Sequence, residues 1–312
     1  MTAPGVIALG ETMLSLIALD GTLATATRFV ATHGGAESNA CVGLVRSGVD
    51  ATWVSRLGTD PAGDRILASL EAEGIDLRWV RRDRDRPTGL MLRDTAGSVR
   101  YYRAGSAASA LSPVDLDEVP VEDARAVLVS GVTALIGEGP RRAAIRLLER
   151  AHGLRVFDPN LRPGLWGSDR ARELVLPLVE RCQLLLAGET ELRTLFGDRP
   201  LEALARASAR VGPDEVVVKR GAAGAAVLDG AGAWLVHTPP PSRDADPVGA
   251  GDAFDAAYLA SRLGGAPPEA ALLEGAACGA AVAASIGDVD GFPVRRSDIV
   301  SSSGAKEEQR DA

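Results

Sequence analysis

Length and composition exclude several classes of protein at once. The chain has 312 residues, of which 46% are hydrophobic and 24% are charged, values typical of a globular protein with a sizeable core rather than a disordered one. Its net charge of −8 argues against nucleic acid or an anionic membrane as a partner, because such surfaces are bound through basic patches.

The sequence also lacks the marks of a membrane or secreted protein. No stretch reaches the roughly 18–20 uncharged apolar residues of a membrane-spanning helix, and residues 1–10 contain no basic segment of a secretory signal. The three cysteines, Cys41, Cys182 and Cys278, are odd in number and widely spaced, a pattern typical of buried thiols in a reducing compartment. We therefore expect a soluble, cytoplasmic protein.

The predicted elements alternate between strands and helices along the chain. Short apolar runs, typical of buried strands, lie at 6–9, 126–129, 154–157, 184–186 and 215–218. Helical patterns lie at 141–150, 201–210 and 252–262. Continuous apolar strands that alternate with helices predict an α/β protein whose mainly parallel sheet is covered on both faces.

Two stretches interrupt this alternation. Residues 11–33 and 87–111 mix small, polar and β-prone residues without a helical period, and we expect them to form a small second sheet on top of the main domain. The polar segment 301–312 is expected to be a flexible tail. The chain is thus expected to be one domain over residues 1–300 with the small sheet as its lid.

The sequence around residue 250 predicts an anion-binding turn. Gly249 and Gly251 lie in the run DPVGAGDAF, residues 246–254, where glycine lets the backbone turn tightly and approach a ligand. The helix that follows would direct free N–H groups and the positive end of its dipole at this turn, an arrangement that favours a phosphate. Asp252 could simply cap that helix, but beside an anion site it could also accept a proton from an attacking hydroxyl, the interpretation we favour.

This run resembles the C-terminal signature of the PfkB/ribokinase family of sugar kinases. The N-terminal signature is also present as HGGAESNA, residues 33–40, followed by SRLGTDPAGD at 55–64. The resemblance extends from about residue 5 to about residue 298. It implies a ribokinase-like three-layer α/β/α fold, a catalytic domain with a small β-sheet lid, and transfer of the γ-phosphate of ATP to a sugar hydroxyl.

The resemblance implies roles at the reaction centre. Asp252 would be the general base, and the backbone of Gly249, Ala250 and Gly251 would form the anion hole for the transferring phosphoryl group. Arg162, in the run DPNLRPGLW at 158–166, would contact the substrate or the phosphoryl group. The sugar would be bound by Gly34, Gly35 and Asn39, the glycines by close approach and the Asn amide by pairing with hydroxyls.

The nucleotide side follows from the same resemblance. Lys219, Gly221 and Gly224 would lie near the phosphates and adenine of ATP, although Lys219 could instead be a solvated strand end. A helix over 275–287 would form the other wall of the adenine pocket, or it could be a close-packed core helix. Its candidate contacts are Ala277 and Gly279.

Magnesium is expected because it bridges nucleotide phosphates. Glu191 carries over from the family's Asn-x-x-Glu element, which helps to order the magnesium shell, whereas Gly188 replaces its Asn. Family members often use a monovalent cation as well. Pro247 stands where a Thr is common, which leaves that ion site open.

The lid suggests the substrate. Residues 101–111, YYRAGSAASAL, resemble the lid of 2-keto-3-deoxygluconate kinases, where Arg103 beside Tyr101 would hold a carboxylate bidentately. Arg103 could equally be a surface charge on an exposed strand. Met91 stands where these kinases commonly place a substrate-contacting Tyr. We expect 2-keto-3-deoxygluconate as substrate and its 6-phosphate as product, with a neutral ketohexose such as fructose as the alternative.

Other classes fit the sequence less well. The run LGETM at 9–13 is not the G-x-G-x-x-G of a Rossmann dehydrogenase, and neither Lys219 nor Lys306 follows the G-x-x-x-x-G of a Walker ATPase. A sugar-binding protein that kept the kinase fold is the non-enzyme alternative, but it would have no need of Asp252 as a base. The open edge of the lid sheet predicts a homo-oligomer formed through the lid.

Overall fold

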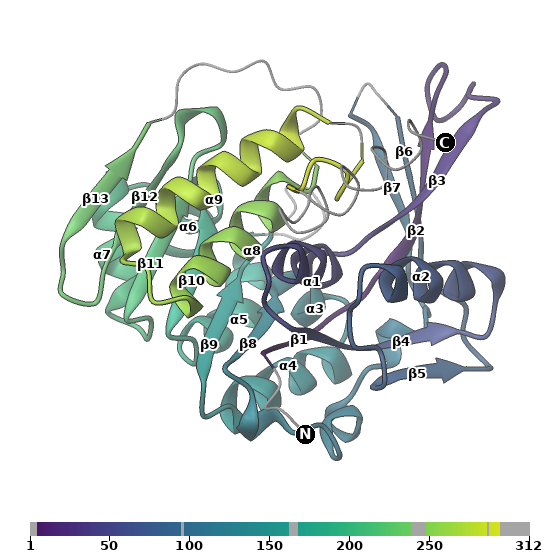
Figure 1. Ribbon diagram of the computed structural model, residues 1–312, viewed down its shortest axis with the longest axis horizontal. Coiled ribbons are helices and arrows are strands. Elements are labelled where there is room, and N and C mark those ends of the chain that lie inside the picture. Colours follow the sequence, from purple (N-terminus) through teal and green to yellow (C-terminus); the bar gives the residue numbers. More distant parts are fainter. Residues whose placement is uncertain (1–4, 95–96, 162–167, 239–247, 286, 294–312) are drawn as a thin grey trace, which may run out of the picture.

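A nine-stranded sheet forms the centre of the molecule (Figure 1). The computed structural model, which describes residues 5–94, 97–161, 168–238, 248–285 and 287–293, orders its strands β13-β12-β11-β10-β9-β8-β1-β4-β5. Neighbouring strands are parallel except at β11–β12 and β12–β13. The bounds are β1 (Val6–Leu9), β4 (Ala51–Gly58), β5 (Val80–Asp83), β8 (Ala126–Ser130), β9 (Leu154–Asp158), β10 (Leu184–Gly188), β11 (Glu215–Lys219), β12 (Ala225–Leu228) and β13 (Trp234–His237).

The five predicted strands are therefore confirmed, and so is a mainly parallel sheet. Strands β4, β5, β12 and β13 were not predicted. The two at the β13 edge are antiparallel and short, and β5 carries the charged sequence VRRD, so that edge strand lacks the apolar run that marks a buried strand.

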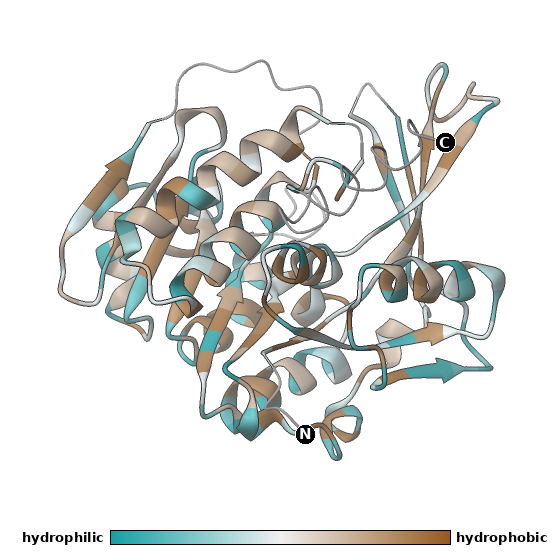
Figure 2. Ribbon diagram, in the orientation of Figure 1, coloured by the Kyte–Doolittle hydropathy of each residue, from teal (hydrophilic) through white to brown (hydrophobic). Residues whose placement is uncertain are grey.

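The alternation of side chains along β1 generates three layers. Val6 and Ala8 belong to the core on one face of the sheet, and Ile7 and Leu9 belong to the core on the other, all of them without exposed surface. Figure 2 shows the apolar colouring of the central strands that this double burial requires. One face is covered by α1 (Ala36–Arg46), α2 (Pro61–Ala72), α8 (Ala250–Leu263) and α9 (Pro268–Ala283). The other is covered by α3 (Gly131–Leu135), α4 (Glu138–Arg150), α5 (Ser168–Val179), α6 (Glu189–Phe196) and α7 (Leu201–Ala209). The expected three-layer α/β/α architecture is confirmed.

The helix predictions were accurate except at one helix. The patterns at 141–150 and 201–210 correspond to α4 and α7, and 252–262 lies within α8. The expected helix over 275–287 is wrong at both ends, because α9 spans Pro268–Ala283. The helix starts earlier than expected because Pro268 fits its first turn, where a backbone N–H has no helical partner. It ends before Gly287, whose φ of 114° is not helical.

A second sheet of four strands forms the lid. Its strands are β2 (Met13–Ala18), β3 (Phe29–Gly34), β6 (Leu90–Arg93) and β7 (Val99–Tyr102), in the order β3-β2-β6-β7. The two chain segments meet where β2 pairs in parallel with β6, and Figure 1 shows the lid standing at one end of the main sheet. The second segment leaves the lid after Tyr102, because Ala108 and Leu111 are buried in the core of the main domain.

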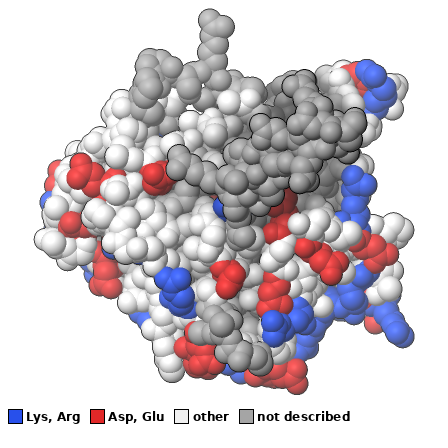
Figure 3. Space-filling model, viewed as in Figure 1, with Lys and Arg blue, Asp and Glu red and all other residues white. Residues whose placement is uncertain are grey.

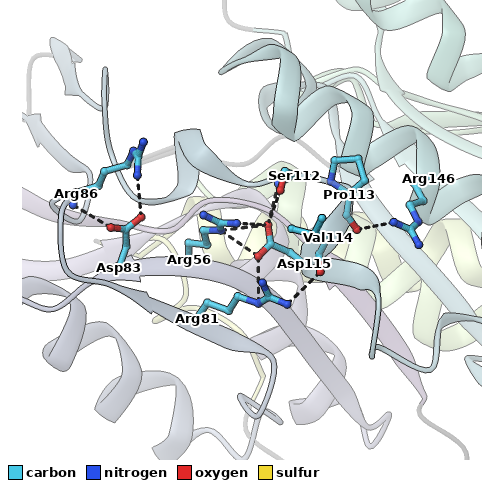
Figure 4. A network of polar contacts seen from close by, with 9 residues as sticks. All are labelled: Arg56, Arg81, Asp83, Arg86, Ser112, Pro113, Val114, Asp115 and Arg146. Atoms are coloured by element: carbon cyan, nitrogen blue, oxygen red, sulfur yellow. Dashed lines mark hydrogen bonds and ion pairs between the residues drawn. The ribbon is translucent and has the colours of Figure 1, made fainter.

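A buried carboxylate anchors the chain where it returns from the lid (Figure 4). Asp115, whose side chain is 1% exposed, pairs with Arg56 of β4 at 2.9 Å and with Arg81 of β5 at 3.2 Å. Its Oδ2 also accepts a hydrogen bond of 2.8 Å from the backbone N–H of Ser112. Both arginines come from the sheet edge, so this contact fixes the returning chain to the main domain.

Basic side chains on this part of the surface are matched by acidic ones. Figure 3 shows Lys and Arg interspersed with Asp and Glu over α2, β4 and β5. Arg78 pairs with Asp76 at 2.9 Å, and Arg82 pairs with Asp64 at 2.7 Å. The arginine-rich run around β5 is therefore not a stripe of unmatched positive charge.

In the described part of the chain, no helix has both the length and the apolar character that crossing a bilayer requires.

Candidate active site

A cavity of about 410 Å³ lies between the lid and the carboxyl ends of the main strands. Parallel strands bring their carboxyl ends to one edge of the sheet, where ligands of open α/β folds bind. Segments that are far apart in the sequence meet there. The predicted residues that line it are Gly34, Gly35, Asn39, Tyr101, Arg103, Glu191, Lys219, Gly249, Gly251 and Asp252. The predicted contact Arg162 lies outside the described residues, as does Pro247, the residue that leaves the cation site open.

The N-terminus of α8 forms the expected anion turn. Gly249 is its N-cap, with φ 85° and ψ −17°, and a side chain there would collide with the backbone oxygen of Asp288, only 2.2 Å from an ideal Cβ. The helix starts at Ala250, and the N–H of Ala253 donates to the Gly249 oxygen at 2.9 Å. The N–H groups of the preceding residues belong to the helix terminus, which favours an anion.

Asp252 lies in the first turn of α8, and its carboxylate is held by amides of two distant residues. Its Oδ2 accepts a hydrogen bond of 2.8 Å from the Asn39 amide, and its Oδ1 accepts one of 3.4 Å from the Asn160 amide. The interpretation of Asp252 as an N-cap is wrong, because Gly249 occupies that position. A buried carboxylate that faces the anion turn is placed to take a proton from a hydroxyl bound in the cavity.

Asn39 and Asn160 are therefore support for the base. Asn39 lines the cavity as predicted, but its amide nitrogen donates to Asp252. Asn160 was not predicted as a site residue. Its signal is its place two residues after the end of the buried strand β9, where polar residues reach the ligand edge of the sheet.

The start of α1 is clamped by a buried glutamate. Glu37 accepts hydrogen bonds of 2.8 Å from the backbone N–H of Ser130 and from the Thr133 hydroxyl. Burial raises the pKa of Glu37 above its ordinary value, although these hydrogen bonds oppose the rise. Gly10 makes room for it, since an ideal Cβ there would lie 2.1 Å from the carboxylate. The clamp fixes the helix that carries Asn39.

Lys219 is a buried counter-ion. Its Nζ donates to both oxygens of Asp255 at 2.9 Å and to Oδ2 of Asp158 at 3.2 Å. Burial opposes the charge, but the two carboxylates outweigh it and raise the pKa of Lys219 above its ordinary value. The interpretation as a solvated strand end is thus wrong. Lys219 still lies beside the anion turn, because its Nζ is 3.7 Å from an ideal Cβ on Gly251.

Arg103 reaches the cavity from the lid, so it is not a surface charge. Its Nε donates to Glu11 at 2.6 Å, and the other oxygen of Glu11 accepts a bond of 2.6 Å from the Ser106 hydroxyl. The guanidinium also lies 5.8 Å from the centre of the Tyr101 ring. Glu11 follows β1 directly and lines the cavity, but the sequence reasoning used it only to exclude a dehydrogenase.

A second arginine–carboxylate pair joins the lid to the segment after α9. Arg93 and Asp288 lie 2.7 Å apart, and each side chain is only 3% exposed. Asp288 packs against the sugar loop, since an ideal Cβ on Gly34 would lie 2.5 Å from its Oδ2. Arg93 was not predicted as part of the site, because it belongs to no short motif, and its pairing with Asp288 joins residues that are distant in sequence.

The nucleotide residues are only partly brought together. Gly221 and Gly224 take left-handed φ values of 54° and 90° in the β11–β12 turn, and neither lines the cavity. Ala277 is exposed on α9. Gly279 instead allows α9 to approach α8, because an ideal Cβ would lie 3.0 Å from the Ala250 oxygen. That contact supports the close-packed alternative for this helix.

Glu191 has a structural contact as well as a place at the cavity. Its Oε2 accepts a hydrogen bond of 2.6 Å from the backbone N–H of Gly188 and so caps α6. Within the described ranges, no three His, Cys, Asp or Glu side chains are grouped as a metal cage. Glu191 could therefore reach a metal ion only as one contact among others.

We predict that Lys219→Met lowers the free energy of unfolding by about 3–5 kcal/mol, because it leaves two buried carboxylates without their counter-ion. Urea denaturation measures the change. The adjacent Arg220→Met removes a 3.4 Å pair with Glu189 that is more exposed, and it should cost about 0–1 kcal/mol. Equal losses for the two variants would contradict the counter-ion role.

Comparisons with known proteins agree with this geometry. The family described as pfkB family carbohydrate kinase matches residues 3–295. The chain is 32% identical to the 2-dehydro-3-deoxygluconokinase of Thermoproteus tenax over 93% of this chain and 91% of the relative. It is 33% identical to the 2-dehydro-3-deoxygalactonokinase of Haloferax volcanii, with 90% and 91% covered. It is 29% identical to the fructokinase of Klebsiella pneumoniae, with 86% and 91% covered.

Solved structures give the same result. A PfkB protein from Polaromonas sp. JS666 superimposes with a TM-score of 0.84 at 36% identity, over 96% of this chain and 99% of the other. A ribokinase II from E. coli in complex with ATP and Mg²⁺ gives 0.87 at 24% identity, with 97% and 99% covered. The chain therefore belongs to the PfkB family and is an ATP-dependent carbohydrate kinase.

Proposed function

We propose that the protein phosphorylates 2-keto-3-deoxygluconate on its 6-hydroxyl and forms 2-keto-3-deoxy-6-phosphogluconate. The observation that carries this proposal is the Asp252 carboxylate, held in the cavity beside the N-terminus of α8. The choice of sugar is supported by Arg103 in the cavity wall and by the 2-dehydro-3-deoxygluconokinases among the relatives.

The reaction needs a base and a cradle for charge. Asp252 accepts the proton of the sugar hydroxyl while the oxygen of that hydroxyl forms a bond to the γ-phosphorus. The bond between the γ-phosphorus and the β-γ bridging oxygen breaks at the same time, and ADP is released. The N–H groups at the start of α8, from Gly249 onward, stabilise the charge on the transferring group. The lid keeps water out of the cavity, so that the sugar rather than solvent is the acceptor.

Magnesium fits this site as an ion carried mainly by the nucleotide. Mg²⁺ keeps several waters and is usually held by one or two carboxylates plus phosphates rather than by an all-protein cage. Glu191, which lines the cavity, is the residue that would contact its shell. When bound, the ion neutralises charge on the phosphates.

A neutral ketohexose is the second candidate, and a specific contact favours it. Glu11 already neutralises Arg103, so a substrate carboxylate must share that guanidinium. Met91 lines the cavity and offers no hydroxyl contact. The fructokinase relative also fits this alternative.

Asp252→Asn is expected to lower kcat by about 10²- to 10⁴-fold, the usual contribution of a general base. The amide keeps the shape of the side chain, so the Kd for sugar and nucleotide should stay within about threefold of wild type. ADP release with purified protein gives the rate, and calorimetry gives the affinities. Sugar-dependent turnover near the wild-type rate in this variant would refute Asp252 as the base. The absence of sugar-dependent turnover in the wild type would favour a binding protein.

Arg103→Ala tests the sugar. We expect kcat/KM for 2-keto-3-deoxygluconate to fall about 10- to 100-fold, because a charge-assisted hydrogen bond is lost, and kcat/KM for fructose to change little. Arg100→Ala is the matched control, since Arg100 is exposed on the adjacent strand β7. If the wild-type protein turns over fructose faster than 2-keto-3-deoxygluconate, the proposed sugar is wrong and the neutral ketohexose is favoured.

The lid sheet is proposed to pair two copies of the chain. It exposes Leu19, Val30 and Tyr102, which are 54%, 41% and 60% accessible, and apolar surface of this kind on an open sheet favours association. Val30→Asp should dissociate the oligomer in sedimentation experiments, whereas Leu273→Asp, at a similarly exposed position on α9, should not. A wild-type protein that sediments as a monomer would refute the pairing.

A further inference from the structure

Asn160 supports the base carboxylate from outside its own helix. Its side-chain amide donates to Oδ1 of Asp252 at 3.4 Å, while the amide of Asn39 donates to Oδ2 at 2.8 Å. Each oxygen of the carboxylate thus receives an amide hydrogen bond. We infer that Asn160 is a positioning residue that holds Asp252 charged and oriented for proton transfer, an inference that rests on the proposed role of Asp252 as general base.

The backbone of Asn160 adopts an uncommon conformation. Its φ is +41°, and it is the one non-glycine residue with a positive φ in the described part of the chain. Asn tolerates this left-handed region better than most residues, yet the conformation is sparsely populated. Such conformations persist where surrounding contacts impose them, and they concentrate at functional sites. Here the residue follows β9 at the cavity and is 4% exposed.

A local hydrogen bond and an ion pair hold Asn160 in place. Its backbone N–H donates to Oδ1 of Asp158 at 2.9 Å, and Oδ2 of Asp158 accepts from Lys219 at 3.2 Å. Lys219 also binds both oxygens of Asp255, which lies three residues after Asp252 on α8. The contacts therefore run from Asp252 through Asn160, Asp158 and Lys219 to Asp255, so they begin and end on α8. Asn160 cannot reorient without breaking hydrogen bonds of this buried network.

The competing explanation is that Asn160 only shapes the turn after β9. The two roles differ in what they do to the protonation of Asp252, because hydrogen bonds donated to a carboxylate favour its charged form. Other charged groups also face this region, and they are unchanged by a substitution at residue 160. They are Asp158 of β9, Lys219 of β11, Glu191 of α6, Asp255 of α8 and the pairs Arg93–Asp288 and Arg103–Glu11.

The test is the pH dependence of kcat/KM in two matched variants. Asn160→Gly accepts the left-handed backbone without strain and deletes the amide, whereas Asn160→Asp keeps the shape and replaces the donor by a negative charge. Activity is lost at low pH when the base is protonated. Loss of a donor makes Asp252 hold its proton to higher pH, so the acid limb should move upward by about 0.5–1 pH unit in Asn160→Gly. It should move further, by about 1–2 pH units, in Asn160→Asp because of like-charge repulsion.

The controls separate the possible outcomes. Arg100→Ala on the exposed side of the lid should leave the acid limb in place, and thermal unfolding shows whether each variant is folded. If Asn160→Asp does not fold, Asn160→Gly alone decides. An acid limb that stays at the wild-type pH while kcat/KM falls at every pH would overturn the positioning role and leave the proposed function intact. Retained turnover in Asp252→Asn would instead refute the base itself.

Discussion

The site depends on keeping one carboxylate charged in a place where water is scarce. Asp252 is 7% exposed, and burial without partners would favour its neutral form. The fold compensates with amide donors from two distant elements and with the N-terminal end of α8, whose dipole favours negative charge. The two amide donors, Asn39 and Asn160, are distant from Asp252 in sequence, so the carboxylate is held in this position only when the sheet, α1 and α8 are packed together.

The architecture explains how so many distant segments reach one cavity. Parallel strands place Asp158, Gly188 and Lys219 at the ends of three adjacent strands, β9, β10 and β11. The lid then closes the opposite side with β2 and β6, which come from separate chain segments but pair directly. Side chains that face each other across β6 and β7, such as Met91 and Tyr101, therefore line the same wall.

The sequence predicted the parts of this site that are encoded locally. The central strands were visible as apolar runs, and the turn before α8 was visible because Gly249 and Gly251 precede a helical pattern. What it could not show are the partners across space. Only the folded chain shows that Asp255, Asp288 and Glu11 neutralise Lys219, Arg93 and Arg103. Asn160 was not predicted as a site residue, since only the folded chain brings its amide to Asp252. The helix α9 was misplaced because its small residues serve packing against α8 rather than a periodic apolar face.

These pairings change how the lid arginines must be understood. An arginine that awaits an anion in an empty cavity would be costly to bury, so Arg93 and Arg103 are each held by a protein carboxylate. A substrate carboxylate then gains only the difference between its own contacts and the repulsion of Glu11, which sits on the same guanidinium. The net gain in binding free energy is small while Glu11 keeps its contact with Arg103. The gain is larger if the substrate draws Arg103 toward itself and Glu11 keeps only its hydrogen bond from the Ser106 hydroxyl. If Arg103 binds the substrate as proposed, selectivity between an acid sugar and a neutral one depends on how far the arginine is shared with Glu11 and not on its presence alone.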